Sequence, residues 1–355
     1  MMARWLWLLV LLSACGGPAA RPADLAQGRA LWDRYCALCH GAEGEGYAAD
    51  NATRLNGQEI LRTASDAFFV QAIRRGRPDT AMAAYGRELG GPLGDEEVDA
   101  LLALIRSWQT EPSIDVSSLE VRGDADRGAP IFASRCASCH GQLGEGASAQ
   151  SLSAWTFLEH ASDGFLRYAI EHGRSGTAMP AFGATLSAQE IDDVVALIRR
   201  WDTEPEALPP GLRPPELAEL AVAAHPDGPP AQFTLREERF VPAAQVRDAV
   251  AQGARLILLD ARATSDWLRR RLPGAIPVPY YEIEPILERL PRDGTWIVAY
   301  CGCPHAASGH VVDALREHGF EHTAVLDEGV HHWISQGYPT ESGPIAPRTS
   351  GGQAP

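Results

Sequence analysis

The sequence predicts a multidomain protein, with two small all-α domains followed by an α/β domain that contains a parallel sheet. Two observations lead to this fold class. A pattern of cysteines, glycines and amphipathic helices occurs twice in about the first two hundred residues. After a proline-rich stretch, strands alternate with helices instead. The length of 355 residues allows two or three ordinary domains.

The internal repeat consists of matching short segments at matching intervals. Cys36-Ala37-Leu38-Cys39-His40-Gly41 recurs as Cys136-Ala137-Ser138-Cys139-His140-Gly141, and Gly76-Arg77 recurs as Gly173-Arg174. A helical pattern leads into each cysteine pair, and glycine-rich loops follow it. Each copy ends in apolar residues spaced as on one face of a helix. These are Val98, Leu101, Leu102 and Ile105 in the first copy and Ile191, Val194, Val195 and Ile198 in the second.

The repeated Cys-X-X-Cys-His is the attachment signature of a c-type haem, whose vinyl groups form thioethers with both thiols while the histidine binds iron. A structural zinc ion would need more ligands than one such motif carries, and a redox Cys-X-X-Cys is expected beside a βαβ unit. The sequence therefore predicts two covalently bound haem c groups. Their predicted ligands are Cys36, Cys39 and His40, then Cys136, Cys139 and His140.

The methionines predict the second axial ligands. The chain has four, and Met1 and Met2 lie in the amino-terminal signal described below. Met82 and Met179 occupy equivalent places in the repeat, about forty residues after each histidine. A thioether is a ligand that raises haem potential and suits electron transfer. His160 and His172 are alternatives in the second copy, but they have no counterpart in the first.

Residues 24–110 and 123–203 resemble the class I cytochrome c family, which implies electron transfer and redox partners such as cytochromes or membrane complexes. The second copy has the Met-Pro pair of that family, Met179-Pro180. The first copy has Met82-Ala83, so we expect a looser ligand loop and a different potential there.

The amino terminus predicts export. Arg4 precedes an apolar run at residues 5–12, too short to span a membrane and typical of a signal peptide. Leu12-Ser13-Ala14-Cys15 resembles a bacterial lipobox, which implies a signal peptide at 1–14, a lipidated Cys15 and a tether at 15–23. An ordinary cleaved signal is the alternative. The lipobox predicts a periplasmic location, with a lipid anchor in a bacterial membrane.

The remaining chain divides into a linker, a third domain and a tail. Residues 204–232 are rich in proline and predict a semi-extended spacer, and residues 341–355 predict a disordered tail. Within 233–340, strands are predicted at 256–260, 276–278, 296–300 and 324–326. Helices are predicted near 265–270, 285–290 and 306–318, so the sheet is parallel. Cys301 directly follows a strand, at the carboxyl end where α/β folds place their sites.

This third domain resembles the rhodanese family. The matching segments are Leu259-Asp260-Ala261-Arg262, Leu272-Pro273-Gly274-Ala275-Ile276, Tyr300-Cys301, and Gly329 with Trp333, Gly337 and Pro339. The resemblance implies that Cys301 is a nucleophile that carries sulfane sulfur as a persulfide. Loop N–H groups and the following helix would favour its thiolate. The loop has no arginine for a thiosulfate-like anion, which argues against thiosulfate as the direct donor and leaves a persulfide or polysulfide donor open.

Several roles around Cys301 stay open at this point. Cys301 itself could be a leftover cysteine in an inactive fold. Cys303 could resolve a persulfide, form a disulfide with Cys301, or be passive. His305 could stabilise the thiolate or be a solvated loop residue. His331 and His332 are interpreted as surface residues, with a metal site as the alternative.

Three functions are compatible with the sequence. The formal net charge of −15 argues against nucleic acid as a partner. The first hypothesis is a lipid-anchored dihaem cytochrome in which Cys301 takes up sulfane sulfur and passes electrons to the haems. The second is a plain electron carrier whose third domain docks or senses, with basic redox partners that suit the acidic chain. The third is a sulfurtransferase that works independently of the haems.

Overall fold

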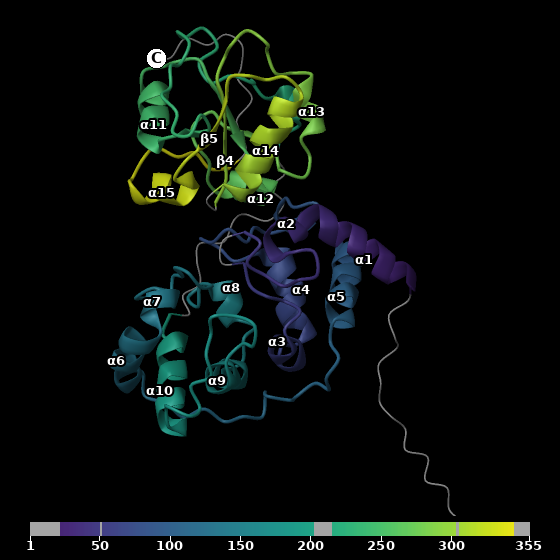
Figure 1. The fold of residues 1–355 in the computed structure, drawn as a ribbon, viewed down its shortest axis with the longest axis vertical. Coiled ribbons are helices and arrows are strands. Elements are labelled where there is room, and N and C mark those ends of the chain that lie inside the picture. Colours follow the sequence, from purple (N-terminus) through teal and green to yellow (C-terminus); the bar gives the residue numbers. More distant parts are fainter. Residues whose placement is uncertain (1–21, 50–51, 202–214, 303–304, 344–355) are drawn as a thin grey trace, which may run out of the picture.

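A computed structural model describes residues 22–49, 52–201, 215–302 and 305–343. Figure 1 shows the two helical domains below and the α/β domain above them. Cys15 and the predicted signal peptide lie outside the described residues, as do Cys303 and most of the predicted tail. No helix of the described segments is both long enough and apolar enough to cross a membrane.

The two copies of the repeat fold alike, around a pair of packed helices. The first copy consists of α1 (Pro22–Tyr35), α2 (Ala37–His40), α3 (Gln58–Thr63), α4 (Asp66–Arg75), a 3₁₀ turn η1 (Arg87–Leu89) and α5 (Asp95–Ser107). The second consists of α6 (Ala125–Arg135), α7 (Ala137–His140), α8 (Trp155–Leu158), α9 (Asp163–His172) and α10 (Ala188–Arg199). In each copy the first long helix packs on the last, α1 on α5 and α6 on α10.

Glycines at equivalent positions allow this close helix pairing. A Cβ on Gly28 would lie 2.3 Å from the carbonyl oxygen of Ala100, and one on Gly128 would lie 2.1 Å from that of Asp193. Both distances are far below any van der Waals contact, so no other residue fits without moving the helices apart. The predicted helices before each cysteine pair are thus confirmed.

The region between each histidine and methionine is more helical than its glycine content suggested. Where glycine-rich loops were expected, the structure has α3 and α4 in the first copy and α8 and α9 in the second. Ser65 caps α4 by accepting a hydrogen bond from Phe68 N at 3.2 Å, and Ser162 caps α9 in the same way at 3.1 Å. These helices build the walls behind the methionine loops.

The third domain has a five-stranded parallel sheet of order β1-β5-β4-β2-β3. Its elements are β1 (Phe240–Val241), α11 (Ala243–Ala251), β2 (Ile257–Asp260), α12 (Thr264–Arg269), β3 (Ile276–Pro277), α13 (Glu284–Leu287), β4 (Ile297–Tyr300), α14 (Ala306–Glu317), β5 (Thr323–Leu326) and α15 (Gly329–Ser335). Successive strand residues alternate between two buried cores. One core holds α12, α13 and α14, and the other holds α11 and α15. The predicted α/β class is confirmed, although β1 and α11 were not expected.

Part of the segment predicted as a spacer lies against this domain. Its described portion, from residue 215, contains a short 3₁₀ turn, η2 (Leu217–Glu219). Leu220 and Ala231 are buried in the two cores of the α/β domain. Ala224 also forms a β-bridge with Leu256. These residues therefore extend the α/β domain beyond the sheet and its helices.

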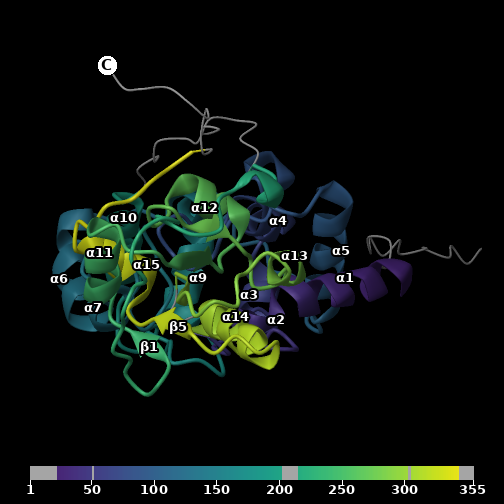
Figure 2. The ribbon, with the colours of Figure 1, turned by 90° about the horizontal axis from the view of Figure 1, so that it is seen from above.

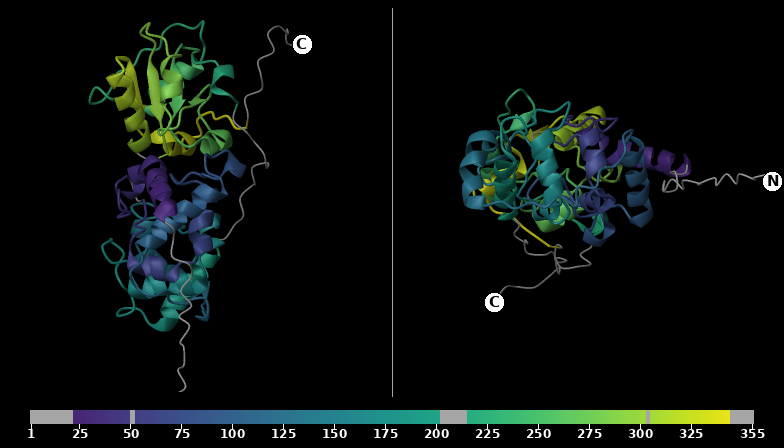
Figure 3. Two further views of the ribbon diagram at one scale, coloured as in Figure 1. Left: turned by 90° about the vertical axis from the view of Figure 1, so that its right-hand side faces the viewer. Right: turned by 90° about the horizontal axis from the view of Figure 1, so that it is seen from below.

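The three domains are in contact, and the α/β domain sits on the first helical domain. In Figures 2 and 3 the region of α14 lies next to α2, and the two helices are in direct contact. Leu38 packs against the core that contains α14. The two helical domains share one apolar core, which includes ring contacts between Phe68 and Phe157 with centroids 5.9 Å apart.

Candidate functional site

The two Cys-X-X-Cys-His motifs adopt the same backbone conformation. In each, a cysteine precedes a single helical turn that ends at the histidine, and the N–H of the second cysteine donates to the carbonyl of the first at 3.1 Å. Gly46 N then donates to the His40 carbonyl at 2.7 Å, and Gly146 N does so to that of His140. Each motif therefore presents its two thiols and its imidazole from one compact turn.

Both histidines are held through Nδ1. His40 Nδ1 lies 2.8 Å from the carbonyl oxygen of Thr53, and His140 Nδ1 lies 2.9 Å from that of Gln150. A carbonyl can only accept, so Nδ1 carries the hydrogen and Nε2 keeps its lone pair. Burial lowers the pKa of both rings, which favours the neutral form. A neutral imidazole oriented by a carbonyl at Nδ1 is the form that binds a metal through Nε2.

The two methionine loops also share one geometry. Met82 N donates to Thr80 Oγ1, and Met179 N donates to Thr177 Oγ1, both at 3.1 Å. The carbonyls of the two methionines accept from Arg77 N at 2.7 Å and from Arg174 N at 3.0 Å. These hydrogen bonds do not show the looser first loop that Ala83 led us to expect. The loop with Ala83 and the loop with Pro180 close with the same main-chain hydrogen bond.

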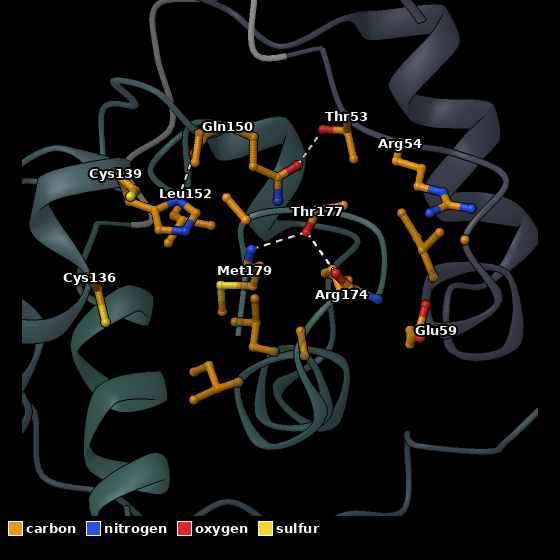
Figure 4. Close-up of a pocket in the computed structure, with 18 of the residues that line it drawn as sticks. Thr53, Arg54, Glu59, Cys136, Cys139, Gln150, Leu152, Arg174, Thr177 and Met179 are labelled. Carbon is orange, nitrogen blue, oxygen red and sulfur yellow. Dashed lines mark hydrogen bonds between the residues drawn. The ribbon is translucent and has the colours of Figure 1, made fainter. Parts of the chain in front are cut away.

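One cavity brings the predicted ligands of the second copy together. Cys136, Cys139, His140 and Met179 all line it, as Figure 4 shows for three of them. Its wall includes residues of the first copy as well: Thr53, Arg54, Glu59 and Phe68. His160 and His172 are not among its lining residues. His172 instead stacks on Tyr168 with ring centroids 4.0 Å apart.

The environment of Arg174 indicates whether this cavity suits a haem. Its Nη1 is buried and makes no hydrogen bond with any described residue, although it lines the cavity. Burial lowers its pKa to about 10, so the guanidinium is still a cation at neutral pH. A buried cation at an apolar cavity needs anionic partners. The carboxylate of Glu59 acts on Arg174 from the cavity wall, and the propionate groups of a haem would supply further negative charge beside the unpaired Nη1. Two thiols, an imidazole, a thioether and this cation together fit a covalently attached haem.

Cys301 lies at the carboxyl end of β4, as predicted, and is 2% exposed. Its Sγ is 3.2 Å from Ser308 Oγ in the first turn of α14. Its carbonyl accepts a hydrogen bond from Val330 N of α15 at 3.0 Å. The positive end of α14 and a hydroxyl that can donate to sulfur both favour a thiolate. Ser308 was not identified from the sequence.

His305 is held by the β5–α15 turn. Its Nε2 lies 2.6 Å from the carbonyl oxygen of Asp327 and 3.3 Å from its Oδ1. The ring also contacts the ring of Phe240, with centroids 4.3 Å apart. His305 is therefore a partly exposed residue, 32% exposed, that is anchored to Asp327.

His331 was interpreted as a surface residue, and the structure corrects this. Its Nε2 is buried, makes no hydrogen bond with any described residue, and lies 3.1 Å from the position of a Cβ on Gly302. Burial lowers its pKa, with a smaller contribution from Arg262. Within the described ranges, no group of three or more His, Cys, Asp or Glu side chains could hold a metal ion. His331 therefore belongs to the surroundings of Cys301.

The Cys301 loop packs against the first methionine loop. A Cβ on Gly302 would lie 3.4 Å from Ala81 Cα, and Ala81 directly precedes Met82. Around this contact, Ser265 Oγ donates to the carbonyl of Ala84 and Tyr280 Oη donates to that of Tyr35, both at 2.6 Å. The α/β domain thus covers the first Cys-X-X-Cys-His motif and its methionine loop. No sequence signal indicated this juxtaposition.

Comparison with known proteins finds similarity in three regions of the chain. Residues 23–105 and 123–198 match the family described as cytochrome c oxidase, cbb3-type, subunit III, and residues 242–336 match the rhodanese-like domain. A cbb3-type cytochrome c oxidase subunit FixP of Azorhizobium caulinodans is 30% identical over 172 residues, which are 47% of this chain and 56% of that protein.

Two further relatives cover different parts of the chain. The cytochrome bc1 complex cytochrome c subunit of Mycobacterium tuberculosis H37Rv is 26% identical over 215 residues, 54% of this chain and 74% of that protein. The rhodanese-like domain of the Anabaena sp. Alr3790 protein is 26% identical, with a TM-score of 0.28, and the match covers 34% of this chain and 89% of that one. The chain spans little more than half the length of the FixP relative. It combines cytochrome c domains, which bind haem c covalently, with a C-terminal rhodanese-like domain.

Proposed function

We propose that this protein is a dihaem electron-transfer lipoprotein that couples sulfane-sulfur chemistry at Cys301 to electron transfer. The observation that carries the proposal is the contact between the Cys301 loop and the Met82 loop, where Gly302 meets Ala81. A rhodanese-like domain with an independent task would have no need to cover a haem motif. The haem c at each Cys-X-X-Cys-His would supply one-electron redox chemistry, and two of them match a two-electron sulfur step.

Sulfur uptake begins at the Cys301 thiolate, which Ser308 and the start of α14 stabilise. The thiolate attacks the outer sulfur of a persulfide donor RS–SH. The S–S bond of the donor breaks, RS⁻ leaves, and Cys301–S–SH forms. Oxidation then adds water: Cys301–S–S⁻ and H₂O give Cys301–S–SOH, one proton and two electrons. Those two electrons are the ones that the haem sites would receive.

The groups around Cys301 favour a donor of low charge. His331 is neutral because burial lowers its pKa. Arg262, whose charge contributes to that shift, is held by Asp260 through a 2.6 Å ion pair. A dianion such as thiosulfate would therefore meet no uncommitted cation among these residues. The sulfane group of an organic persulfide carries at most one negative charge and loses less hydration on entry.

Location and partners follow from the relatives and from the amino terminus. The FixP and bc1 relatives are subunits of respiratory complexes by name. We therefore expect membrane complexes or small cytochromes as redox partners, on the periplasmic side of the membrane, with the chain anchored through a lipidated Cys15. The net charge of −15 suits basic partner surfaces and makes association sensitive to salt.

A second candidate function is a plain electron carrier in which the rhodanese-like domain is a docking module. The burial of Leu38 against the core around α14 favours it, because this contact covers the first haem motif irrespective of sulfur chemistry. In that case partners would reach the second haem site, and Cys301 would be dispensable for electron transfer.

Stopped-flow spectroscopy separates the two candidates. The oxidised holoprotein is mixed with glutathione persulfide, beside Cys301→Ser, and Cys303→Ser is measured as well because the role of this second thiol is open. We expect fast haem reduction in the wild type and none in Cys301→Ser. All three proteins must remain reducible by dithionite. Equal reduction of Cys301→Ser would remove Cys301 from the pathway and leave the electron carrier.

A further inference from the structure

A chain of hydrogen bonds connects His40 of the first cytochrome c domain to His140 of the second. His40 Nδ1–H donates to the carbonyl of Thr53 at 2.8 Å, and His140 Nδ1–H donates to the carbonyl of Gln150 at 2.9 Å. Between the domains, Thr53 Oγ1–H donates to Gln150 Oε1 at 2.8 Å, as Figure 4 shows. Every link from one ring to the other is a covalent bond or a hydrogen bond.

Thr53 and Gln150, which link the two domains, have equivalent positions and contacts in the repeat. Each lies in the loop after its own Cys-X-X-Cys-His motif and holds the histidine of that motif with its main-chain carbonyl. Each then uses its side chain to contact the other. The first loop is further fixed on the second domain, because Arg54 Nη1 donates to the carbonyl of Ser175 at 3.0 Å. Thr53 and Gln150 thus meet in a restrained contact at the edge of the second cavity.

We propose that Thr53 and Gln150 are positioning residues that couple the two haem sites through their axial histidines. This inference rests on the proposed function, which assigns one haem to each motif. An imidazole that gives electron density to its metal donates a stronger hydrogen bond from Nδ1, and bonds in a chain polarise one another. Loss of an electron at one site therefore changes the bond that orients the other histidine. The same contiguous chain is the route for electron exchange between the domains.

The test uses the holoprotein, with Thr53→Val and Gln150→Leu as variants that keep both main-chain carbonyls. Thr156→Val is the matched control. It removes another hydrogen bond between the same domains, from Thr156 Oγ1 to the carbonyl of Gly76 at 2.7 Å, which touches neither histidine. Haem content per chain is measured first. Exchange between the two sites is then followed in half-reduced protein after photochemical reduction, and both reduction steps are titrated.

We expect several-fold slower exchange in Thr53→Val and in Gln150→Leu, with a smaller separation between the two reduction steps. The double variant should be no slower than either single variant, because both remove one bond. Thr156→Val should exchange like the wild type, although all three variants lose some thermal stability. The absorption spectra should stay unchanged, since neither axial ligand is altered.

Two results would overturn the inference. Wild-type exchange in Thr53→Val would remove the chain as a route, and equal slowing in Thr156→Val would assign the effect to domain contact in general. Fewer than two haems per chain would overturn the proposed function together with this inference. Because photoreduction bypasses Cys301, failure of the sulfur chemistry alone would leave these rates unaffected.

Discussion

The two cytochrome c domains hold their predicted ligands alike but have different neighbours. In both, a carbonyl orients the histidine and a threonine hydroxyl accepts from the methionine N–H. The rhodanese-like domain covers the first motif, whereas the second cavity is walled by Thr53, Arg54 and Glu59 of the first domain. The repeated sequence thus sets ligand geometry, and the contacts between domains decide which reactants reach each site.

The paired helices also differ between the copies. In the second, Arg127 of α6 forms a 2.8 Å ion pair with Asp193 of α10, a carboxylate that is only 3% exposed. The equivalent positions in the first copy are Gln27 and Ala100, which carry no charge. The second helix pair therefore has an ionic contact at positions where the first has uncharged residues.

Replacing the methionines should have the largest effect. Met82→Ala and Met179→Ala each remove a proposed thioether ligand, so each should lower the reduction potential at its own site. Redox titration and the loss of methionine-to-iron absorption measure this. Because Ala81 contacts Gly302, only Met82→Ala should also change the rate of the Cys301 reaction. Equal changes in that rate for both variants would contradict the asymmetry between the sites.

The next effect concerns the helix glycines. Gly28→Ala and Gly128→Ala should each destabilise the protein by about 1–3 kcal/mol, because the new methyl group overlaps a carbonyl. An ordinary glycine-to-alanine change within a helix stabilises instead by about 0.5–1 kcal/mol, so the sign is diagnostic. Urea unfolding measures both, with the exposed Gln27→Ala on the same helix as control. Stabilisation by either variant would show that the helices can separate without cost.

The smallest effect is an acid sensitivity that arises from the Arg127–Asp193 ion pair of the second domain. The hydrogen bond and charge of Arg127 lower the pKa of Asp193 from 3.8 to about 2. A depressed carboxyl pKa adds stability above pH 4, which is lost as the pH falls towards 2. Arg127 is largely exposed, so screening limits the contribution to about 1 kcal/mol. Asp193→Asn should abolish this loss in unfolding measured at pH 4 and pH 2. An unchanged pH dependence would rule out the ion pair as its cause.

The sequence was most informative where one short motif determines the local backbone conformation. Cys-X-X-Cys-His predicted both attachment turns, and the rhodanese-like segments predicted the sheet and the place of Cys301. In such segments the chemistry of the site and the backbone conformation depend on the same few residues. Sequence periodicity also predicted α5 and α10, which are long enough to show an apolar face.

The sequence was least informative where structure depends on another domain. Helix α4 was missed in part because its two aromatic residues face different domains: Phe69 lies under Arg106 of its own domain, whereas Phe68 faces the second. Phe68 packs against Phe157 and Phe165 of the second domain, with ring centroids 5.9 and 5.1 Å apart. The buried place of His331 was missed for the same reason, since Ala81 and Gly302 come from different domains. The spacing of apolar residues within one segment does not show which residues of another domain pack against it.

The packing of the rhodanese-like domain over the first Cys-X-X-Cys-His motif has a consequence for haem attachment. Cys36 and Cys39 flank Leu38, which packs against the core around α14, and the main chain of Tyr35 accepts the Tyr280 hydroxyl. An attachment enzyme must reach both thiols while it joins them to haem. The rhodanese-like domain occupies that approach once it has docked. If haem is attached at Cys36 and Cys39 as proposed, that attachment would have to precede docking of the rhodanese-like domain.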